Sequence, residues 1–160
     1  MKKSSRNVVK SICLNATFAA LYFVLVIAFG DISFGFANGL ISLRIAEILI
    51  ALCIFDKRFI PGAIIGCFCA NLLSGQVVDL IVGTIQSTIT VYLLYYIKNK
   101  QLALVLGSFM CGLMIGLEIY FLGFSAIGLW VIVTTFIGEL LILEIGYFLF
   151  KRYYNLIIKK

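Results

Sequence analysis

The sequence predicts an all-α integral membrane protein with six transmembrane helices, and three observations support this fold class. Of the 160 residues, 63% are hydrophobic and only 12% are charged. The mean hydropathy is +1.15, far above the values of soluble domains. The basic residues stand at the ends of apolar runs, a placement that indicates membrane topology rather than nucleic-acid binding.

The chain is expected to form one membrane domain, 1–160. Its predicted helices cover about residues 11–30, 42–55, 59–74, 79–97, 102–122 and 129–150, with an outer loop over 31–41. The first apolar run follows a basic leader and is longer than a signal-peptide core, about 7 to 15 residues, so it is predicted to be an uncleaved helix. Within it, Ala16 and Ala20 form a small-xxx-small pair that lets another helix approach, either from this chain or from a partner.

The second helix is short and charged. Between the glycine-rich outer loop and Asp56 it has about 14 residues, or roughly 21 Å as an α-helix, against about 30 Å for a bilayer core. Short, glycine-interrupted segments are typical of transporter binding sites. Arg44 and Glu47 lie three apart, so they share a helix face and can pair. The alternative is a helix-end pair that reaches the lipid headgroups.

The third helix begins with Pro61 in its first turn, where a missing N–H costs nothing. Gly62, Gly66 and Ala70 recur at every fourth position and predict a flat stripe for close packing. Asn71 follows near the far end of this helix.

The fourth helix is predicted to open at Asp79, which is either a functional carboxylate or a residue that favours the positive helix end. Its interior is unusually polar and contains Thr84, Gln86, Ser87, Thr88 and Thr90. In the fifth helix, Glu118 lies about one turn from the end. The sixth contains Glu139 and Glu144, and Glu139 is expected roughly 15 Å deep, near the midplane.

Six spans place every basic residue except Arg44 on one side of the membrane. That side holds Lys2, Lys3, Arg6, Lys10, Lys57, Arg58, Lys98, Lys100, Lys151, Arg152, Lys159 and Lys160. The positive-inside rule makes it cytoplasmic, with both termini inside.

The acidic residues show the complementary pattern, because all of them except Asp56 lie at the outer end or within the membrane. Intramembrane carboxylates need partners, protonation or a wet cavity, and one internal arginine cannot pair with all of them. The pattern favours an outward-opening negative pocket for a cationic or donor-rich solute. The alternative is a set of protonated glutamates that hydrogen-bond to Gln86 and the Ser/Thr residues.

Several function classes are excluded or disfavoured. Without histidine, the usual metal sites and Ser-His or Cys-His catalysis are excluded, and no metal or other cofactor is expected. The five cysteines, Cys13, Cys53, Cys67, Cys69 and Cys111, are interpreted as packing residues. Without a P-loop, any use of ATP must come from partners. An enzyme is not predicted, whereas a small ion-coupled carrier stays an alternative.

Several short motifs resemble one transporter family over nearly the whole chain. They are Arg44-Ile45-Ala46-Glu47, Pro61-Gly62, Gly66, Asn71-Leu72-Leu73-Ser74-Gly75, Asp79, Gly83-Thr84 and Gly138-Glu139-Leu140. In this order they resemble the queuosine-precursor transporter family QueT, whose members are substrate-binding components (S-components) of energy-coupling factor (ECF) transporters.

The resemblance implies a six-helix S-component in the bacterial plasma membrane. Such a component captures a scarce solute outside and docks on a transmembrane coupling subunit, EcfT, which two cytoplasmic ATPases drive. The resemblance also implies that Ala16 and Ala20 form the docking surface and that the ligand is prequeuosine, the aminomethyl-deazaguanine precursor of queuosine. Another vitamin or nucleobase-like solute is the alternative ligand.

The chemistry of this ligand suits the carboxylates. A guanine-like edge offers adjacent N–H donors that one carboxylate can accept, and an aminomethyl cation needs a second carboxylate. Glu47 and Glu139 are the candidates for these roles, and Arg44 is expected to orient Glu47 or to donate to the ring carbonyl. The remaining candidate binding residues are Asn71, Asp79 and Glu118.

Overall fold

The computed structural model describes residues 2–30, 44–74, 76–122 and 128–157, and these residues form helices without any strand. The all-α prediction is therefore confirmed for this part of the chain. The predicted outer loop 31–41 and most of the turn before the last helix lie outside the described residues.

Four long helices dominate the fold. They are α1 (Lys2–Ala28), α4 (Val77–Tyr96), α5 (Lys100–Phe121) and α6 (Gly128–Ile157). Each contains an apolar stretch long enough to cross a membrane, over Asn7–Ala28, Val77–Tyr96, Lys100–Phe121 and Trp130–Tyr153. The predicted number of six spans requires that the two short segments between α1 and α4 also cross, and that number stays a prediction.

The second predicted helix is a 3₁₀-helix rather than an α-helix. It is η1 (Ile45–Ile54), followed by the short η2 (Lys57–Phe59). A 3₁₀-helix rises about 2.0 Å per residue, so η1 spans roughly 20 Å although it is shorter in residues than predicted. Side chains three apart eclipse one another in this helix type, and Glu47, Ile50 and Cys53 accordingly form one fully buried row.

The third segment confirms the predicted start and packing stripe. The helix α3 (Ile60–Asn71) has Pro61 at its beginning and continues into η3 (Leu72–Ser74). A Cβ atom on Gly62 would lie 2.9 Å from the backbone oxygen of Asn15, and one on Gly66 would lie 3.0 Å from Cβ of Tyr22. Both glycines are therefore needed for the close approach of α1 and α3.

The long helices extend beyond several predicted ends. The helix α1 begins at Lys2 instead of residue 11, and α6 continues to Ile157 instead of residue 150. Lysine and arginine are good helix formers, so a basic segment at the membrane surface ends an apolar run without ending the helix. At the start of α5, Oδ1 of Asn99 caps the helix by accepting a hydrogen bond from the Leu102 N–H at 3.3 Å.

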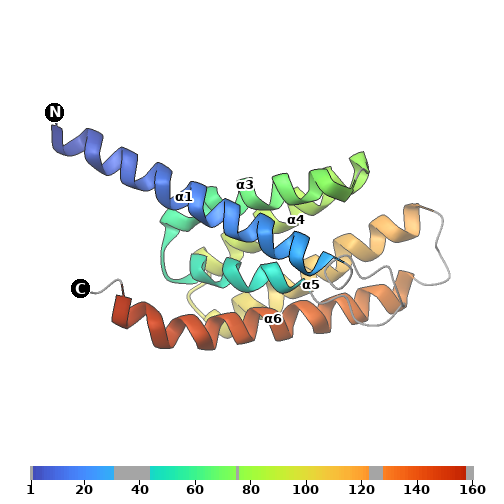
Figure 1. Ribbon diagram of the computed structural model, residues 1–160. Coiled ribbons are helices and arrows are strands. Elements are labelled where there is room, and N and C mark those ends of the chain that lie inside the picture. Colours follow the sequence, from blue (N-terminus) through green and yellow to red (C-terminus); the bar gives the residue numbers. More distant parts are fainter. Residues whose placement is uncertain (1, 31–43, 75, 123–127, 158–160) are drawn as a thin grey trace.

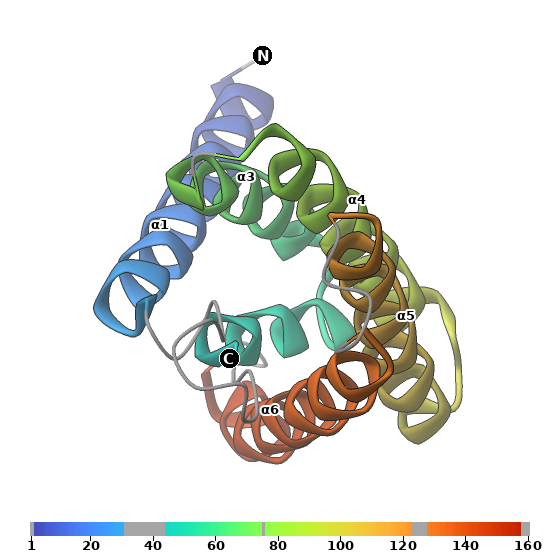
Figure 2. The ribbon, with the colours of Figure 1, turned by 90° about the vertical axis from the view of Figure 1, so that its right-hand side faces the viewer.

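The helices form a closed ring. Each of α1, α3, α4, α5 and α6 contacts the next, and η1 packs against α6, α1 and α4 (Figure 2). The helix α1 starts and α6 ends at the same end of the bundle (Figure 1). Between η1 and α6 the contact is close, because a Cβ atom on Gly146 would lie 2.7 Å from the Ile48 carbonyl oxygen. The ring therefore brings η1 against α1, α4 and α6.

Candidate functional site

Arg44 and Glu47 form the predicted ion pair at the beginning of η1. Nη2 of Arg44 lies 3.6 Å from Oε1 of Glu47, and the two side chains are 14% and 0% exposed. Arg44 is the residue that precedes the first turn of η1, so its side chain and that of Glu47 fall on the same side. Glu47 is fully buried, so its carboxylate points into the bundle of described helices rather than to the surface.

The guanidinium of Arg44 also connects two other helices. Nη1 donates a hydrogen bond to Oε1 of Gln86 on α4 at 2.8 Å and lies 3.8 Å from Sγ of Cys111 on α5. Gln86 is fully buried, and its Nε2 donates to Oγ1 of Thr90 at 3.2 Å. The polar face predicted for the fourth helix therefore turns toward the arginine.

One oxygen of Glu47 carries nearly all of its contacts. Oε1 accepts a hydrogen bond from the Tyr22 hydroxyl of α1 at 2.9 Å and lies 3.3 Å from Oγ of Ser87 on α4. The other oxygen, Oε2, is buried and has no hydrogen-bond partner among the described residues. Three side chains therefore fix the carboxylate of Glu47 through Oε1 and leave Oε2 as an open acceptor.

Asn71 joins this cluster through a buried thiol. Its Nδ2 lies 3.4 Å from Sγ of Cys67 and 3.5 Å from Oγ1 of Thr84, and the Cys67 thiol donates to Oγ of Ser87 at 3.0 Å. Gly83 makes room for the asparagine, because a Cβ atom there would lie 2.6 Å from Nδ2. The structure thus places the predicted Asn71 next to the Glu47 cluster.

Glu139 is fully buried on α6, and neither of its oxygens accepts a hydrogen bond from a nitrogen or oxygen donor within the described part of the chain. The charges of Glu47 and Arg44 both act on it, and Cys111 is a further neighbour. The cluster therefore contains two buried carboxylates beside one buried guanidinium. It also contains three carboxylate oxygens without a donor, namely Oε2 of Glu47 and both oxygens of Glu139.

The last two predicted residues form a second, more peripheral acidic pair. Glu118 is 8% exposed near the end of α5, and it experiences the charges of Asp79 and Arg44. Asp79 is half-buried in the first turn of α4, where the positive helix end favours a carboxylate. Glu118 therefore lies within electrostatic range of both Asp79 and Arg44.

Sequence reasoning missed three residues of the cluster. Tyr22 received no role, although a tyrosine hydroxyl inside an apolar helix needs a partner, and that requirement is a usable signal. Cys67 and Cys111 were interpreted as packing residues. Both are fully buried, as packing predicts, but their sulfur atoms also contact the polar side chains. The spacing of cysteines along the chain contains no signal for these contacts.

The arrangement suits a buried site for a cation with several N–H donors. Its open groups are acceptors, and the partly buried guanidinium of Arg44 is already bound to Glu47 and Gln86. A bundle of long apolar helices that encloses such charges is typical of a multi-pass membrane protein that handles a polar solute.

Comparison with known families agrees with this class. The family model described as QueT transporter matches residues 12–155, which is nearly the whole chain. The protein belongs to the QueT transporter family and is a membrane transporter rather than an enzyme. Neither a curated protein nor a solved structure gives a significant match to the sequence.

Proposed function

We propose that the protein is the S-component of an ECF transporter and captures a queuosine precursor, the aminomethyl deazaguanine, for uptake. The observation that carries this proposal is the set of three buried carboxylate oxygens at Glu47 and Glu139 that accept no hydrogen bond from a nitrogen or oxygen donor of the described residues. Buried acceptors without partners cost free energy, so a ligand that supplies donors gains affinity from them.

The ligand matches the two carboxylates in different ways. Its guanine-like edge presents adjacent N–H donors to one carboxylate, and its aminomethyl cation pairs with the other. Arg44 holds Glu47 in place and donates to the ring carbonyl. Asn71, Asp79 and Glu118 supply further polar contacts and negative potential on the outer side.

A titration of the purified protein tests the ligand. We expect the aminomethyl deazaguanine to bind more tightly than guanine, which lacks the cation, and more tightly than any member of a panel of vitamins. Tighter binding of one of the vitamins would show that the aminomethyl deazaguanine is not the substrate, while the proposal of an S-component would stand. Mass spectrometry of the small molecules that co-purify with the protein provides an independent check.

The docking surface for the coupling subunit EcfT is proposed on the outward face of α1. Ala16 and Ala20 are exposed there, so they are not used for packing within the described bundle. Two cytoplasmic ATPase subunits would drive EcfT. Ala16→Trp and Ala20→Trp should abolish uptake while solute affinity stays within about twofold, because bulk at these positions blocks a helix from outside. Uptake by the protein reconstituted alone with an ion gradient would identify a self-sufficient carrier instead.

The orientation is part of the same proposal. We propose six crossings with both termini in the cytoplasm, because the basic residues gather on one side of such an arrangement. A single new cysteine at Lys98 should be protected from an impermeant thiol reagent in intact cells, whereas one at Gln76 should react. Labelling at Lys98 from outside would overturn this topology.

A further inference from the structure

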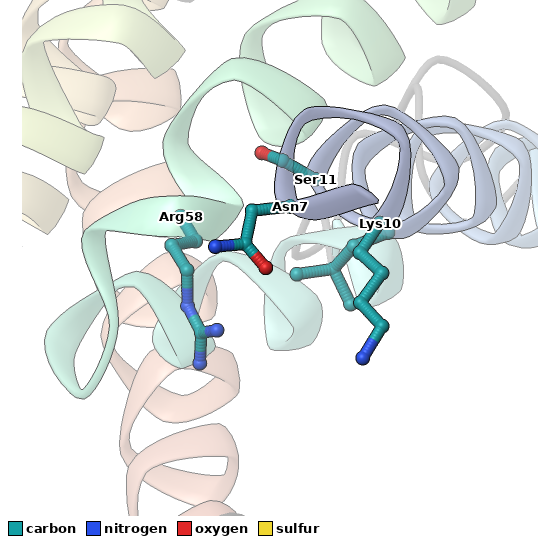
Figure 3. A pocket seen from close by; sticks show the side chains of 5 residues that line it. Asn7, Lys10, Ser11 and Arg58 are labelled. Atoms are coloured by element: carbon teal, nitrogen blue, oxygen red, sulfur yellow. The ribbon is translucent and has the colours of Figure 1, made fainter. Parts of the chain in front are cut away.

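A second polar region lies between the beginning of α1 and η2. It is a cavity of about 500 Å³ lined by Asn7, Lys10, Ser11, Leu14 and Arg58. The four residues from α1 recur at helical spacing and share one face. Figure 3 shows the Asn7 amide between the side chains of Arg58 and Lys10, which extend in the same direction. None of the buried carboxylates of the candidate solute site lines this cavity.

The wall of the cavity is held by a bridge between α1 and α3. Nδ2 of Asn15 donates to the Ser11 carbonyl oxygen at 2.8 Å, and Oδ1 of the same side chain accepts from the Gly62 N–H at 2.7 Å. This bridge fixes the height of α1 relative to the segment that carries Arg58. The two backbone segments that carry the lining residues are therefore held together before any ligand arrives.

Arg58 is oriented by Asp56. The carboxylate accepts from the Arg58 backbone N–H at 2.9 Å and from its Nε at 2.8 Å, and Nη2 lies 2.6 Å from Oδ2. The Arg58 side chain nevertheless stays 57% exposed. On the opposite wall, no carboxylate of the described residues forms an ion pair with Lys10. Two cations and one carboxylate leave this region with a net positive charge.

The lining is complementary to a phosphate group that carries apolar chains. It offers donors from an ammonium, a guanidinium, an amide and a hydroxyl, together with the apolar side chain of Leu14. The adjoining surface of α1 exposes Val8, Val9 and Ile12, which are 55%, 55% and 62% exposed. In a membrane protein such side chains face acyl chains. In the proposed orientation this end of α1 lies at the cytoplasmic leaflet, where basic residues attract anionic lipids.

We propose that this cavity binds the headgroup phosphate of an anionic phospholipid, with Lys10 and Arg58 on the phosphate oxygens. Asn7 and Ser11 donate further hydrogen bonds, and the acyl chains follow the apolar face of α1. The lipid would fasten the start of α1 to η2 at the membrane surface. This inference does not depend on which solute the protein carries.

Native mass spectrometry with phosphatidylglycerol and phosphatidylcholine tests the proposal. Wild type should retain phosphatidylglycerol preferentially. Lys10→Gln should weaken its binding roughly 5-fold, and Lys10→Gln combined with Arg58→Gln roughly 10- to 30-fold. The matched control is Lys57→Gln with Lys98→Gln, which removes the same charge at two exposed positions outside the cavity and should leave the preference nearly intact.

Three results would overturn the proposal. An equal loss in the control and the cavity variant would show general surface attraction. Unchanged binding in the Lys10→Gln variant, which breaks no ion pair of the described residues, would remove the cavity from lipid recognition. Displacement of the lipid by millimolar inorganic phosphate, with no preference between the two lipids, would identify a site for free anions instead.

Discussion

The 3₁₀-helix η1 is flanked by two pairs of arginine and carboxylate that look alike in the sequence and differ in their chemistry. At its end, both oxygens of Asp56 are occupied by groups of Arg58, two positions away. At its beginning, Glu47 is bound by Arg44 and by two residues that are 25 and 40 positions distant, and one of its oxygens stays open.

The difference teaches how a structural ion pair can be told from a binding site. Asp56 caps η2, and both of its carboxylate oxygens are engaged by the nearby Arg58, so neither is left without a donor. Glu47 is fully buried, fixed by long-range contacts and only half satisfied. A buried acceptor without a donor is costly, so Glu47 is the carboxylate of these two pairs that we propose for ligand binding.

The largest expected loss of ligand affinity follows from changing either Glu47 or Glu139, the two carboxylates with open oxygens. Glu47→Gln or Glu139→Gln keeps the shape but loses the charge and turns one acceptor into a donor that faces a donor of the ligand. Binding of the aminomethyl deazaguanine should weaken by about 2 to 4 kcal/mol, or roughly 30- to 1000-fold. Titration of each purified variant measures this change, and affinities equal to that of wild type would remove both residues from the site.

Glu144→Gln is the matched comparison on the same helix. Glu144 also has one buried oxygen without a partner among the described residues, but it lies five positions beyond Glu139, where about 7.5 Å of helical rise separates them. We expect a far smaller loss of affinity in the same titration. A loss as large as that of Glu139→Gln would extend the site toward the C-terminal half of α6.

A smaller effect is expected from Tyr22→Phe, which removes the hydroxyl that donates to Glu47 at 2.9 Å. The ring stays in place, so only the orientation of the carboxylate is relaxed, and affinity should fall about 10-fold. Tyr96→Phe, at a 71% exposed position, is the control and should bind like wild type. If Tyr22→Phe binds equally well, Glu47 does not need this contact for binding.

The smallest effect on binding is expected from Asp56→Ala. This change removes the cap of η2 and the partner of Arg58, which should destabilise the fold by about 1 kcal/mol and lower the melting temperature by about 2 to 4 °C. Solute affinity should stay within about twofold, because Asp56 offers no open acceptor. A large loss of affinity at unchanged melting temperature would contradict the distinction between the two pairs.

The sequence by itself determined the helical class, the apolar segments and the elements that depend on near neighbours. Three features follow from local spacing, and the structure confirms each of them: Pro61 in the first turn of α3, the packing stripe of Gly62 and Gly66, and the pairing of Arg44 with Glu47. These features could be predicted because residues three or four apart meet on one helix face whatever the rest of the chain does.

Only the tertiary structure decided how the site is assembled. It determined that the second segment is a 3₁₀-helix, that Tyr22 and Ser87 hold Glu47, and that Glu139 has no nitrogen or oxygen donor among the described residues. The tertiary structure also leaves Ala16 and Ala20 exposed on the surface of α1. Each of these features depends on which helices meet in the closed ring. Contacts between residues 25 or 40 positions apart leave no repeating pattern in the sequence from which they could be predicted.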